Sequence, residues 1–219
     1  GEYLGEYMNI ESRIFDLERI KYPVSATMIR ENTFLHWEHI PEEIRYYFIK
    51  KICIYGPEST GKSVLTEKLA NYYNTNFVEE TARNIVDREG ISIDTISKIF
   101  TSHAEEIIEK SKTADKFLFI DSDYITTEIY SNFFFKEIPQ YPLWVINANK
   151  FGTYLFCDVD VPWISDSQRF TQNLRQESRN WFIEGLEKRG LKYELINGSD
   201  YEDRFKKAVS IIEKKFFPS

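Results

Sequence analysis

The sequence predicts an α/β protein in which helices flank a parallel sheet, preceded by a mostly helical N-terminal segment. Two observations support this fold class. From residue 50 onward, short apolar runs alternate with longer amphipathic segments, which is typical of parallel strands joined by crossover helices. Residues 1–48 contain instead a charged start and a short segment broken by Pro41, and they include no long strand-like run.

Hydrophobic periodicity predicts the elements after residue 50. Residues 51–55 and 117–120 are continuous apolar runs of strand length. Within residues 81–112, apolar residues recur at a period near 3.6 and mark one helical face, formed by Ile96, Ile99, Phe100, Ala104, Ile107 and Ile108. The predicted strands are 51–55, 76–79, 117–120, 153–158 and 192–196. The predicted helices are 61–73, 123–133, 171–189 and 200–215, together with several helices across 81–112.

The composition disfavours several classes of protein. The 219 residues carry a formal net charge of -7, whereas a nucleic-acid-binding surface needs clustered Lys and Arg. The longest apolar runs are far shorter than the roughly 20 residues of a membrane-spanning helix, and residues 1–7 do not resemble a signal peptide. Cys53 and Cys157 lie in apolar runs that suit free, buried thiols. We therefore expect a cytoplasmic protein that binds a small molecule and has no nucleic-acid or membrane partner. The sequence leaves homo-oligomerisation open.

A phosphate-binding loop is predicted between the first strand and the helix after it. Residues 56–63 read Gly-Pro-Glu-Ser-Thr-Gly-Lys-Ser, which matches the P-loop pattern Gly-x4-Gly-Lys-Ser. Its glycines let the backbone curl around phosphates, its lysine reaches the β- and γ-phosphates, and its last hydroxyl ligates Mg²⁺. The pattern predicts ATP and Mg²⁺ as cofactors. The expected nucleotide-binding residues are Gly56, Pro57, Glu58, Ser59, Thr60, Gly61, Lys62, Ser63 and Val64.

An acidic residue should end a neighbouring strand, because Mg²⁺ in P-loop proteins is held by such a carboxylate as well as by the loop hydroxyl. Asp121 follows the apolar run 117–120 and fits this role, so we expect Ser63 and Asp121 to be the metal ligands. Asp123 comes two residues later, at the start of the next predicted helix. It is either the N-cap of that helix or a substrate contact, and the sequence supports both interpretations.

Other motifs favour a small-molecule kinase over a GTPase. Asn149-Lys-Phe-Gly152 lacks the aspartate of the guanine-reading motif, and Asp121-Ser-Asp-Tyr124 lacks the glycine of the GTPase switch. Arg169, Arg175 and Arg179 lie where small-molecule kinases carry a lid whose guanidinium groups stabilise the transferring phosphoryl group. The alternative is that these arginines form a solvated helical face. The predicted fold is therefore a parallel sheet of the P-loop kinase type.

Four motifs together resemble one family. They are the P-loop at 56–63, Glu-Thr-Ala-Arg at 80–83, Phe-Ile-Asp-Ser-Asp-Tyr-Ile-Thr-Thr at 119–127 and Pro-Trp-Ile-Ser-Asp-Ser-Gln-Arg at 162–169. In these motifs the chain resembles the ribosylnicotinamide kinase domain of the bacterial bifunctional nicotinamide-nucleotide adenylyltransferase/ribosylnicotinamide kinase proteins. The resemblance implies a parallel P-loop kinase sheet. It also implies transfer of the γ-phosphoryl group of ATP to the 5′-hydroxyl of nicotinamide riboside.

The resemblance suggests roles for the motif residues. We expect catalytic roles for Lys62, Asp123, Glu80, Arg169 and Arg175. A carboxylate should orient the acceptor hydroxyl and accept its proton, and the sequence does not decide between Glu80 and Asp123. An aromatic face, from Trp163 or Tyr124, would suit the cationic nicotinamide ring, although each of these side chains has a core-packing interpretation as well. The expected substrate-binding residues are Glu80, Arg83, Asp123, Tyr124, Trp163 and Asp166.

Residues 1–49 resemble the end of the adenylyltransferase domain. Val24-Ser-Ala-Thr-Met-Ile-Arg30 is similar to the Ile-Ser-x-Thr-x-Ile-Arg signature of nucleotidyltransferases, and residues 41–51 resemble the connector into the kinase. The His-x-Gly-His signature that holds ATP phosphates in the transferase is absent from this sequence. We therefore expect a transferase remnant with its connector at 1–49 and a kinase domain at 50–219, in a chain that is a piece of a longer protein.

Two positions depart from the family pattern. Thr81 stands where the family usually has tyrosine, and Ser167 stands where it has glycine. These differences leave the acceptor less well defined than ATP. The alternatives to a ribosylnicotinamide kinase are a kinase for another nucleoside or nucleotide, and an ATP-sensing regulatory module.

Overall fold

The chain divides into two units, Gly1–Pro41 and Glu42–Ser219, in the computed structural model. The structure describes residues 6–9, 11, 16, 18, 20–162 and 172–217. In the first unit, α2 (Ala26–Glu31) begins after Ser25, whose hydroxyl accepts a hydrogen bond from the Met28 N–H at 3.1 Å. The short 3₁₀ helix η1 (Trp37–His39) follows, and the Trp37 side chain is buried. The regular elements described in this unit are helices, as the sequence predicts.

A five-stranded sheet forms the second unit, and each pair of neighbouring strands is parallel. The strands are β1 (Lys50–Tyr55), β2 (Phe77–Val78), β3 (Phe117–Asp121), β4 (Thr153–Cys157) and β5 (Glu194–Ile196). Their order in the sheet is β2-β3-β1-β4-β5, with β1 at the centre. Because parallel strands end at the same edge, the loop after β1 lies beside the residues that follow β3 and β4. The sheet order therefore places the predicted phosphate loop next to Asp121.

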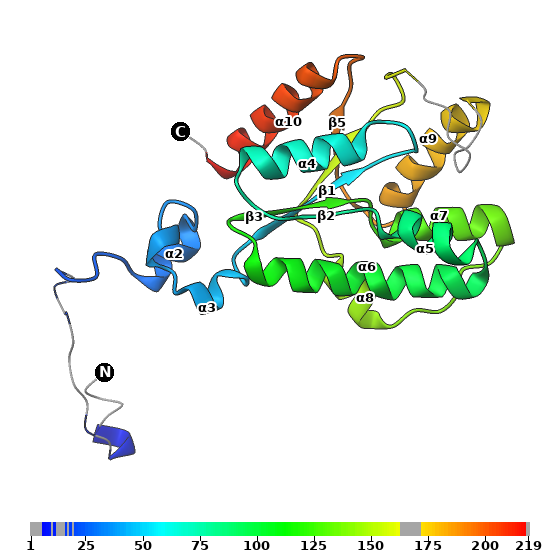
Figure 1. The fold of residues 1–219 in the computed structure, drawn as a ribbon. Coiled ribbons are helices and arrows are strands. Elements are labelled where there is room, and N and C mark those ends of the chain that lie inside the picture. The colour runs from blue at the N-terminus through cyan, green and yellow to red at the C-terminus, as the bar shows by residue number, and fades with distance from the viewer. Residues whose placement is uncertain are drawn as a thin grey trace. The chain divides into compact units, whose positions relative to one another are not determined.

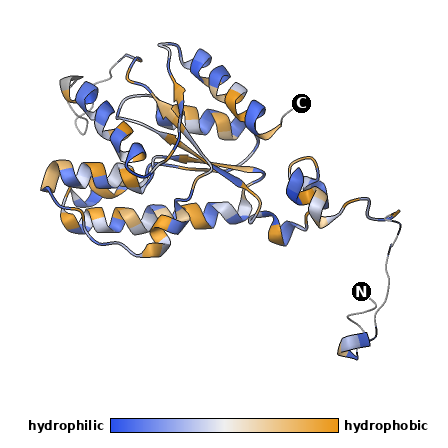
Figure 2. Ribbon diagram, turned by 180° about the vertical axis from the view of Figure 1, so that it is seen from behind, coloured by the Kyte–Doolittle hydropathy of each residue, from blue (hydrophilic) through white to orange (hydrophobic). Residues whose placement is uncertain are grey.

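Helices cover both faces of this sheet. The short α3 (Glu42–Arg45) precedes β1, and the later helices are α4 (Lys62–Tyr72), α5 (Thr81–Glu89), α6 (Ile93–Thr113), α7 (Tyr124–Phe135), α8 (Leu143–Ala148), α9 (Gln172–Glu187) and α10 (Tyr201–Phe216). Helices α4 and α10 lie on one face, and α6 and α8 lie on the other (Figure 1). Many of these helices carry hydrophobic residues on one side and hydrophilic residues on the other (Figure 2). The predicted parallel sheet with flanking helices is confirmed.

Alternating strand residues build two separate apolar layers. One layer includes Cys53 and Tyr55 of β1, which pack with Phe156, Phe182 and other side chains of β4, α7 and α9. Fully burying a side chain of this size stabilises the fold by about 1.5–3 kcal/mol, as an upper estimate. Both cysteines of the chain are buried and free, as expected.

The opposite face of β3 carries an aromatic cluster. The ring of Phe117 lies 4.9 Å from Tyr73, next to the end of α4, and 5.4 Å from Phe216 at the end of α10. Both pairs have the edge-to-face geometry that aromatic rings prefer. This cluster attaches the C-terminal ends of α4 and α10 to the sheet.

The predicted helices across 81–112 are α5 and α6, which separate where Gly90 adopts a φ of +73° and Ser92 caps α6 with a capping box to Thr95. Helix α8 was not predicted, since its six residues read as a short apolar run that periodicity cannot assign. Among the described helices, none is long and apolar enough to cross a membrane.

Candidate active site

The loop between β1 and α4 has a shape that only glycine permits at two positions. Gly56 has a φ of +136°, and a Cβ atom there would lie 2.6 Å from the carbonyl oxygen of Cys157. Gly61 has a φ of +78°, and a Cβ atom there would lie 2.5 Å from the ring of Tyr201. Side chains are excluded by conformation and by space at both positions. The loop therefore packs its backbone directly against β4 and α10.

Lys62 begins α4, and its ammonium group is buried against the loop. The side-chain Nζ donates a hydrogen bond of 2.8 Å to the Pro57 carbonyl oxygen, which also accepts one of 2.7 Å from the Thr60 hydroxyl. The helix N-terminus adds a partial positive charge at the same place. A buried ammonium and a helix N-terminus together make this end of the site attractive to anions.

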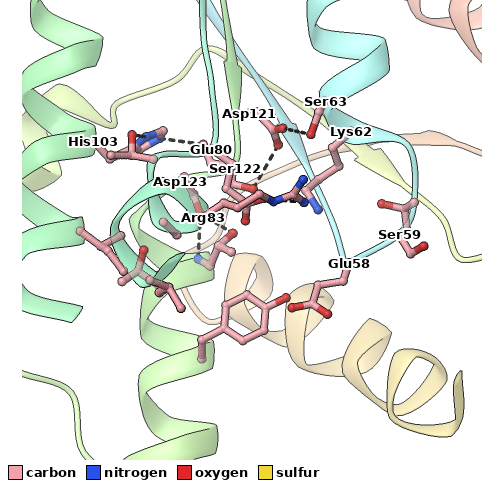
Figure 3. Close-up of a pocket in the computed structure, with 18 of the residues that line it drawn as sticks. Glu58, Ser59, Lys62, Ser63, Glu80, Arg83, His103, Asp121, Ser122 and Asp123 are labelled. Atoms are coloured by element: carbon pink, nitrogen blue, oxygen red, sulfur yellow. Dashed lines mark hydrogen bonds and ion pairs between the residues drawn. The ribbon is translucent and has the colours of Figure 1, made fainter. Parts of the chain in front are cut away.

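Asp121 ends β3 and faces the loop. Its Oδ2 atom accepts a hydrogen bond of 2.5 Å from the Ser63 hydroxyl, and Figure 3 shows this contact with Lys62 beside it. Burial and the charge of Glu80 raise the pKa of Asp121 to about 6, although Lys62 and the Ser63 hydrogen bond oppose the rise. The carboxylate is thus held in a dry environment next to a cation and a hydroxyl.

Asp123 caps α7 and is also buried. Its Oδ1 atom accepts a hydrogen bond of 3.0 Å from the Thr126 N–H, and its Oδ2 atom accepts one of 3.1 Å from the Tyr154 hydroxyl. Burial raises the pKa of Asp123 to about 6 despite these hydrogen bonds. The N-cap interpretation is correct, and the same carboxylate lines the cavity described below. The cap does not exclude a contact with a ligand.

Glu80 and Arg83 belong to the turn after β2 and the start of α5. Their charged groups lie 4.0 Å apart, and the Glu80 side chain is 23% exposed. His103 of α6 lies behind this turn, with Nδ1 3.0 Å from the Thr81 hydroxyl. Burial lowers the pKa of His103 to about 4, so its imidazole is neutral at physiological pH. Sequence reasoning missed His103, because a single histidine in an amphipathic helix gives no signal of burial.

One cavity of about 740 Å³ connects these groups. Loop residues 58–64 form one side, and Glu80, Arg83, Asp121 and Asp123 line it together with them. Apolar and aromatic side chains complete the wall, among them Val86, Ile91, Ile96, Ile99, Tyr130 and Phe134. The cavity has the size of a typical small-molecule site, with cations at one end and carboxylates beside them. It can hold a phosphorylated ligand next to a second small molecule.

The family model described as AAA domain matches residues 51–204 of the chain. The chain belongs to this family. The matched segment runs from β1 into α10 and includes every described residue that lines the cavity.

The AAA domain has relatives among curated proteins and solved structures. The chain is 30% identical over 217 residues to the trifunctional NAD biosynthesis/regulator protein NadR of Escherichia coli (strain K12), covering 95% of this chain and 53% of that protein. The chain thus spans about half the length of this curated relative. A crystal structure of NadR protein in complex with NAD and AMP-PNP is 26% identical, with a TM-score of 0.75, covering 100% of this chain and 65% of that chain.

Two further structures share the fold. A NadR protein in complex with NR matches at 24% identity with a TM-score of 0.78, covering 100% of this chain and 67% of that chain. Thymidylate kinase from Candida albicans matches at 13% identity with a TM-score of 0.54, covering 76% of this chain and 92% of that chain. The five-stranded parallel sheet of this AAA domain is therefore that of the P-loop kinases.

The structure brings together many of the sequence-predicted site residues. Glu58 to Val64, Glu80, Arg83, Asp121 and Asp123 all line the one cavity. Trp163, Asp166 and Arg169 lie outside the described residues, so their expected roles stay predictions.

Four predicted residues that the structure describes do not line the cavity, namely Gly56, Pro57, Tyr124 and Arg175. The Tyr124 ring lies 5.9 Å from Tyr141, and its hydroxyl accepts a hydrogen bond of 3.2 Å from the Arg189 Nε. Arg175 is buried, and its Nη2 donates to the backbone carbonyls of Ser59 and Val161. The contact of either side chain with a ligand stays a prediction.

The site residues fit ATP and Mg²⁺. The Ser63 hydroxyl and the Asp121 carboxylate place two oxygen atoms together, and oxygen is the ligand that Mg²⁺ prefers. No group of three or more His, Cys, Asp or Glu side chains in the described part of the chain could hold a metal ion. Mg²⁺ usually takes only one or two protein ligands in phosphate-transferring sites, and phosphate and water complete its shell. The pair of oxygens therefore suits a metal that arrives with a nucleotide.

Proposed function

We propose that the chain is an ATP-dependent kinase of NAD metabolism that phosphorylates the 5′-hydroxyl of nicotinamide riboside. The products are nicotinamide mononucleotide and ADP. The observation that carries this proposal is the single cavity in which the phosphate loop, the Ser63 and Asp121 oxygens and two further carboxylates meet. The likeness to NadR proteins, whose solved structures include complexes with NR and with NAD and AMP-PNP, supports this choice of substrate.

The loop and Lys62 bind and orient the phosphates of ATP. Lys62 exchanges the Pro57 carbonyl for phosphate oxygens, because a buried ammonium gains more from an anion than from a neutral acceptor. Ser63 and Asp121 would hold Mg²⁺, which would neutralise charge on the phosphates when it is bound. Arg83 extends from α5 into the same cavity and adds a second cation. Positioning and charge stabilisation then provide most of the rate enhancement.

A carboxylate orients the acceptor hydroxyl and takes its proton. Asp123 suits this role, because its pKa of about 6 keeps it ionised at neutral pH and makes it a stronger base than an ordinary aspartate. Glu80 is the alternative, since it lines the same cavity. Tyr130 and Phe134 offer aromatic surface for the cationic nicotinamide ring in the described part of the wall.

The two parts of the chain then have different roles. Residues 50–219 are the kinase domain, and residues 1–49 are the tail of an adenylyltransferase domain with its connector. The helix that begins after Ser25 falls within the segment that resembles the transferase signature, and this supports the assignment. The activities of the longer relatives beyond the kinase are outside this proposal.

A panel of acceptors tests the proposed reaction. ADP release is measured with Mg-ATP and nicotinamide riboside, uridine, adenosine or thymidine monophosphate, and the product is identified by mass spectrometry. We expect turnover with the riboside and a product heavier by one phosphoryl group. Turnover of another acceptor in preference to the riboside would favour a different nucleoside or nucleotide kinase. Binding of ATP without turnover of any acceptor would favour a nucleotide sensor.

A further inference from the structure

Two buried arginines hold the phosphate loop from its outer side. Arg175 of α9 donates a hydrogen bond of 3.1 Å from Nη2 to the Ser59 carbonyl, and Arg204 of α10 donates one of 2.7 Å from Nη1 to the Thr60 carbonyl. The two residues are 6% and 2% exposed, and neither is among the described residues that line the cavity. Two successive loop carbonyls therefore point away from the cavity.

The direction of these carbonyls fixes the direction of two amide groups. In a trans peptide the C=O and the following N–H point in opposite directions, and the chain has no cis peptide among its described residues. When the Ser59 and Thr60 carbonyls face the arginines, the N–H groups of Thr60 and Gly61 face the cavity. Amide groups of this loop are the donors that cradle nucleotide phosphates. The arginines thus orient phosphate-binding groups that they do not touch.

The loop needs such support because its backbone is strained. Ser59 has a φ of +57°, a left-handed conformation that costs about 1 kcal/mol or more for a residue with a side chain. The hydrogen bonds from Arg175 and Arg204 to the peptide groups that follow Ser59 and Thr60 offset this cost. Without them, the peptide groups can rotate toward a relaxed conformation and turn their N–H groups out of the cavity.

Arg204 is itself held rigidly by three other acceptors. Its Nε donates to the Gly198 carbonyl at 2.5 Å, and its Nη2 donates to the Asp158 carbonyl at 2.9 Å and to the Asp160 carboxylate. These acceptors lie in the connections that follow β4 and β5. The buried charge is thus paired and its guanidinium plane is fixed, as burial of an arginine requires.

We propose that Arg204, supported by Arg175, is a positioning residue that sets the affinity of the loop for nucleotide phosphates. This positioning role deepens the proposed function. It rests on the proposed function only for the choice of ATP as the ligand. It also gives Arg175 a positioning role that needs no contact with the transferring phosphoryl group. The chemistry recognised is that of a polyphosphate chain, with or without a base attached.

Calorimetric titration with Mg-ATP and with Mg-tripolyphosphate tests the inference on the full chain. We expect Arg204→Met to weaken both ligands roughly tenfold to hundredfold, the range for loss of a charged hydrogen-bonding group. Arg204→Lys should recover part of this loss, because an ammonium can still reach one carbonyl. Lys207→Met is the matched control, since Lys207 lies on the same helix and bonds to Asn197 instead of the loop.

Three outcomes would overturn the inference. One is unchanged affinity in an Arg204→Met protein that unfolds cooperatively near the wild-type temperature. Another is weaker binding of Mg-ATP with unchanged binding of tripolyphosphate, which would locate the effect at the nucleoside part of ATP instead of its phosphates. If Arg204→Met does not fold, Arg175→Met is used in its place. The third outcome is a tripolyphosphate affinity of Arg175→Met equal to that of the wild type. Binding needs no acceptor, so failure of the riboside assay does not affect this test.

Discussion

Replacing Asp123 by asparagine separates its role as a helix cap from its proposed role as the base that accepts the proton of the acceptor hydroxyl. The amide keeps an oxygen for the Thr126 N–H, so the cap of α7 is retained. The Tyr154 hydroxyl can turn and accept a hydrogen bond from the amide nitrogen, so the two buried groups stay hydrogen-bonded to each other. The substitution therefore removes the negative charge with little change to the local structure.

The magnitude of the stability change follows from the pKa. Burial raises the pKa of Asp123 from 3.8 to about 6, so ionisation in the folded protein costs up to about 3 kcal/mol at neutral pH. Because the folded pKa is higher, this cost appears as pH rises from about 4 to about 6 and is constant above that range. The hydrogen bond between the amide and Tyr154 is weaker than the one to the carboxylate, which offsets about 1 kcal/mol. We expect Asp123→Asn to be as stable as the wild type or more stable at pH 7.

Activity should change in the opposite direction. Loss of a general base lowers turnover by about 10²- to 10⁴-fold, while the affinity for Mg-ATP stays within a few-fold. In the wild type, kcat/KM should rise as pH increases through about 6, because the base acts only when it is ionised. The assay is ADP release with nicotinamide riboside, combined with calorimetry for ATP and urea unfolding at pH 7. Glu80→Gln is the comparison variant.

Normal turnover in Asp123→Asn would refute this reasoning, and the base would then be sought at Glu80. A flat kcat/KM profile between pH 5 and pH 7 would do the same, because a base with a pKa of about 6 cannot act unprotonated throughout that range. If the substitution lowers both the ATP affinity and the turnover, Asp123 instead contributes to binding the metal ion.

Four other outcomes are expected. Lys62→Ala should lower turnover by at least about 10²-fold without changing the unfolding midpoint, whereas Lys188→Ala, at an exposed position, should behave as wild type in both assays. Gly56→Ala should lower stability and nucleotide binding in urea and calorimetric titrations, because its Cβ atom would lie 2.6 Å from a carbonyl oxygen of β4, whereas Gly152→Ala meets nothing within 4 Å and should lower neither. Asp121→Asn should raise the Mg²⁺ concentration needed for half-maximal turnover, and an unchanged metal requirement would argue against its role as a ligand. The chain should not form NAD from nicotinamide mononucleotide and ATP, which chromatography of the products checks, because its sequence has no His-x-Gly-His signature.

Local chemistry explains which parts of the site could be predicted from the sequence. The loop at 56–63 is a contiguous pattern, and Asp121 directly follows an apolar run, so each could be recognised without knowledge of the fold. The strand order of the sheet brings them together, and no local pattern encodes that order. The sequence therefore identified the chemical groups before the structure showed their arrangement.

Long-range contacts explain what could not be predicted. Arg204 lies in an amphipathic helix with many charged residues, and its burial depends on loops that are distant in sequence. Helix α8 is too short for its periodicity to distinguish it from a strand. Asp123 could be assigned as a cap from its position, but its partner Tyr154 belongs to a strand that follows much later in the chain.

Helix α10 is fixed to the rest of its unit near both ends. Arg204 contacts the phosphate loop near one end, and the Phe216 ring contacts Phe117 of β3 at the other. Each residue of a helix adds about 1.5 Å of length and about 100° of rotation. Inserting or deleting one residue between the two contacts would therefore turn one of them away from its partner. Substitutions on the exposed face of α10 change neither contact, so the length of this helix is more tightly constrained than its surface composition.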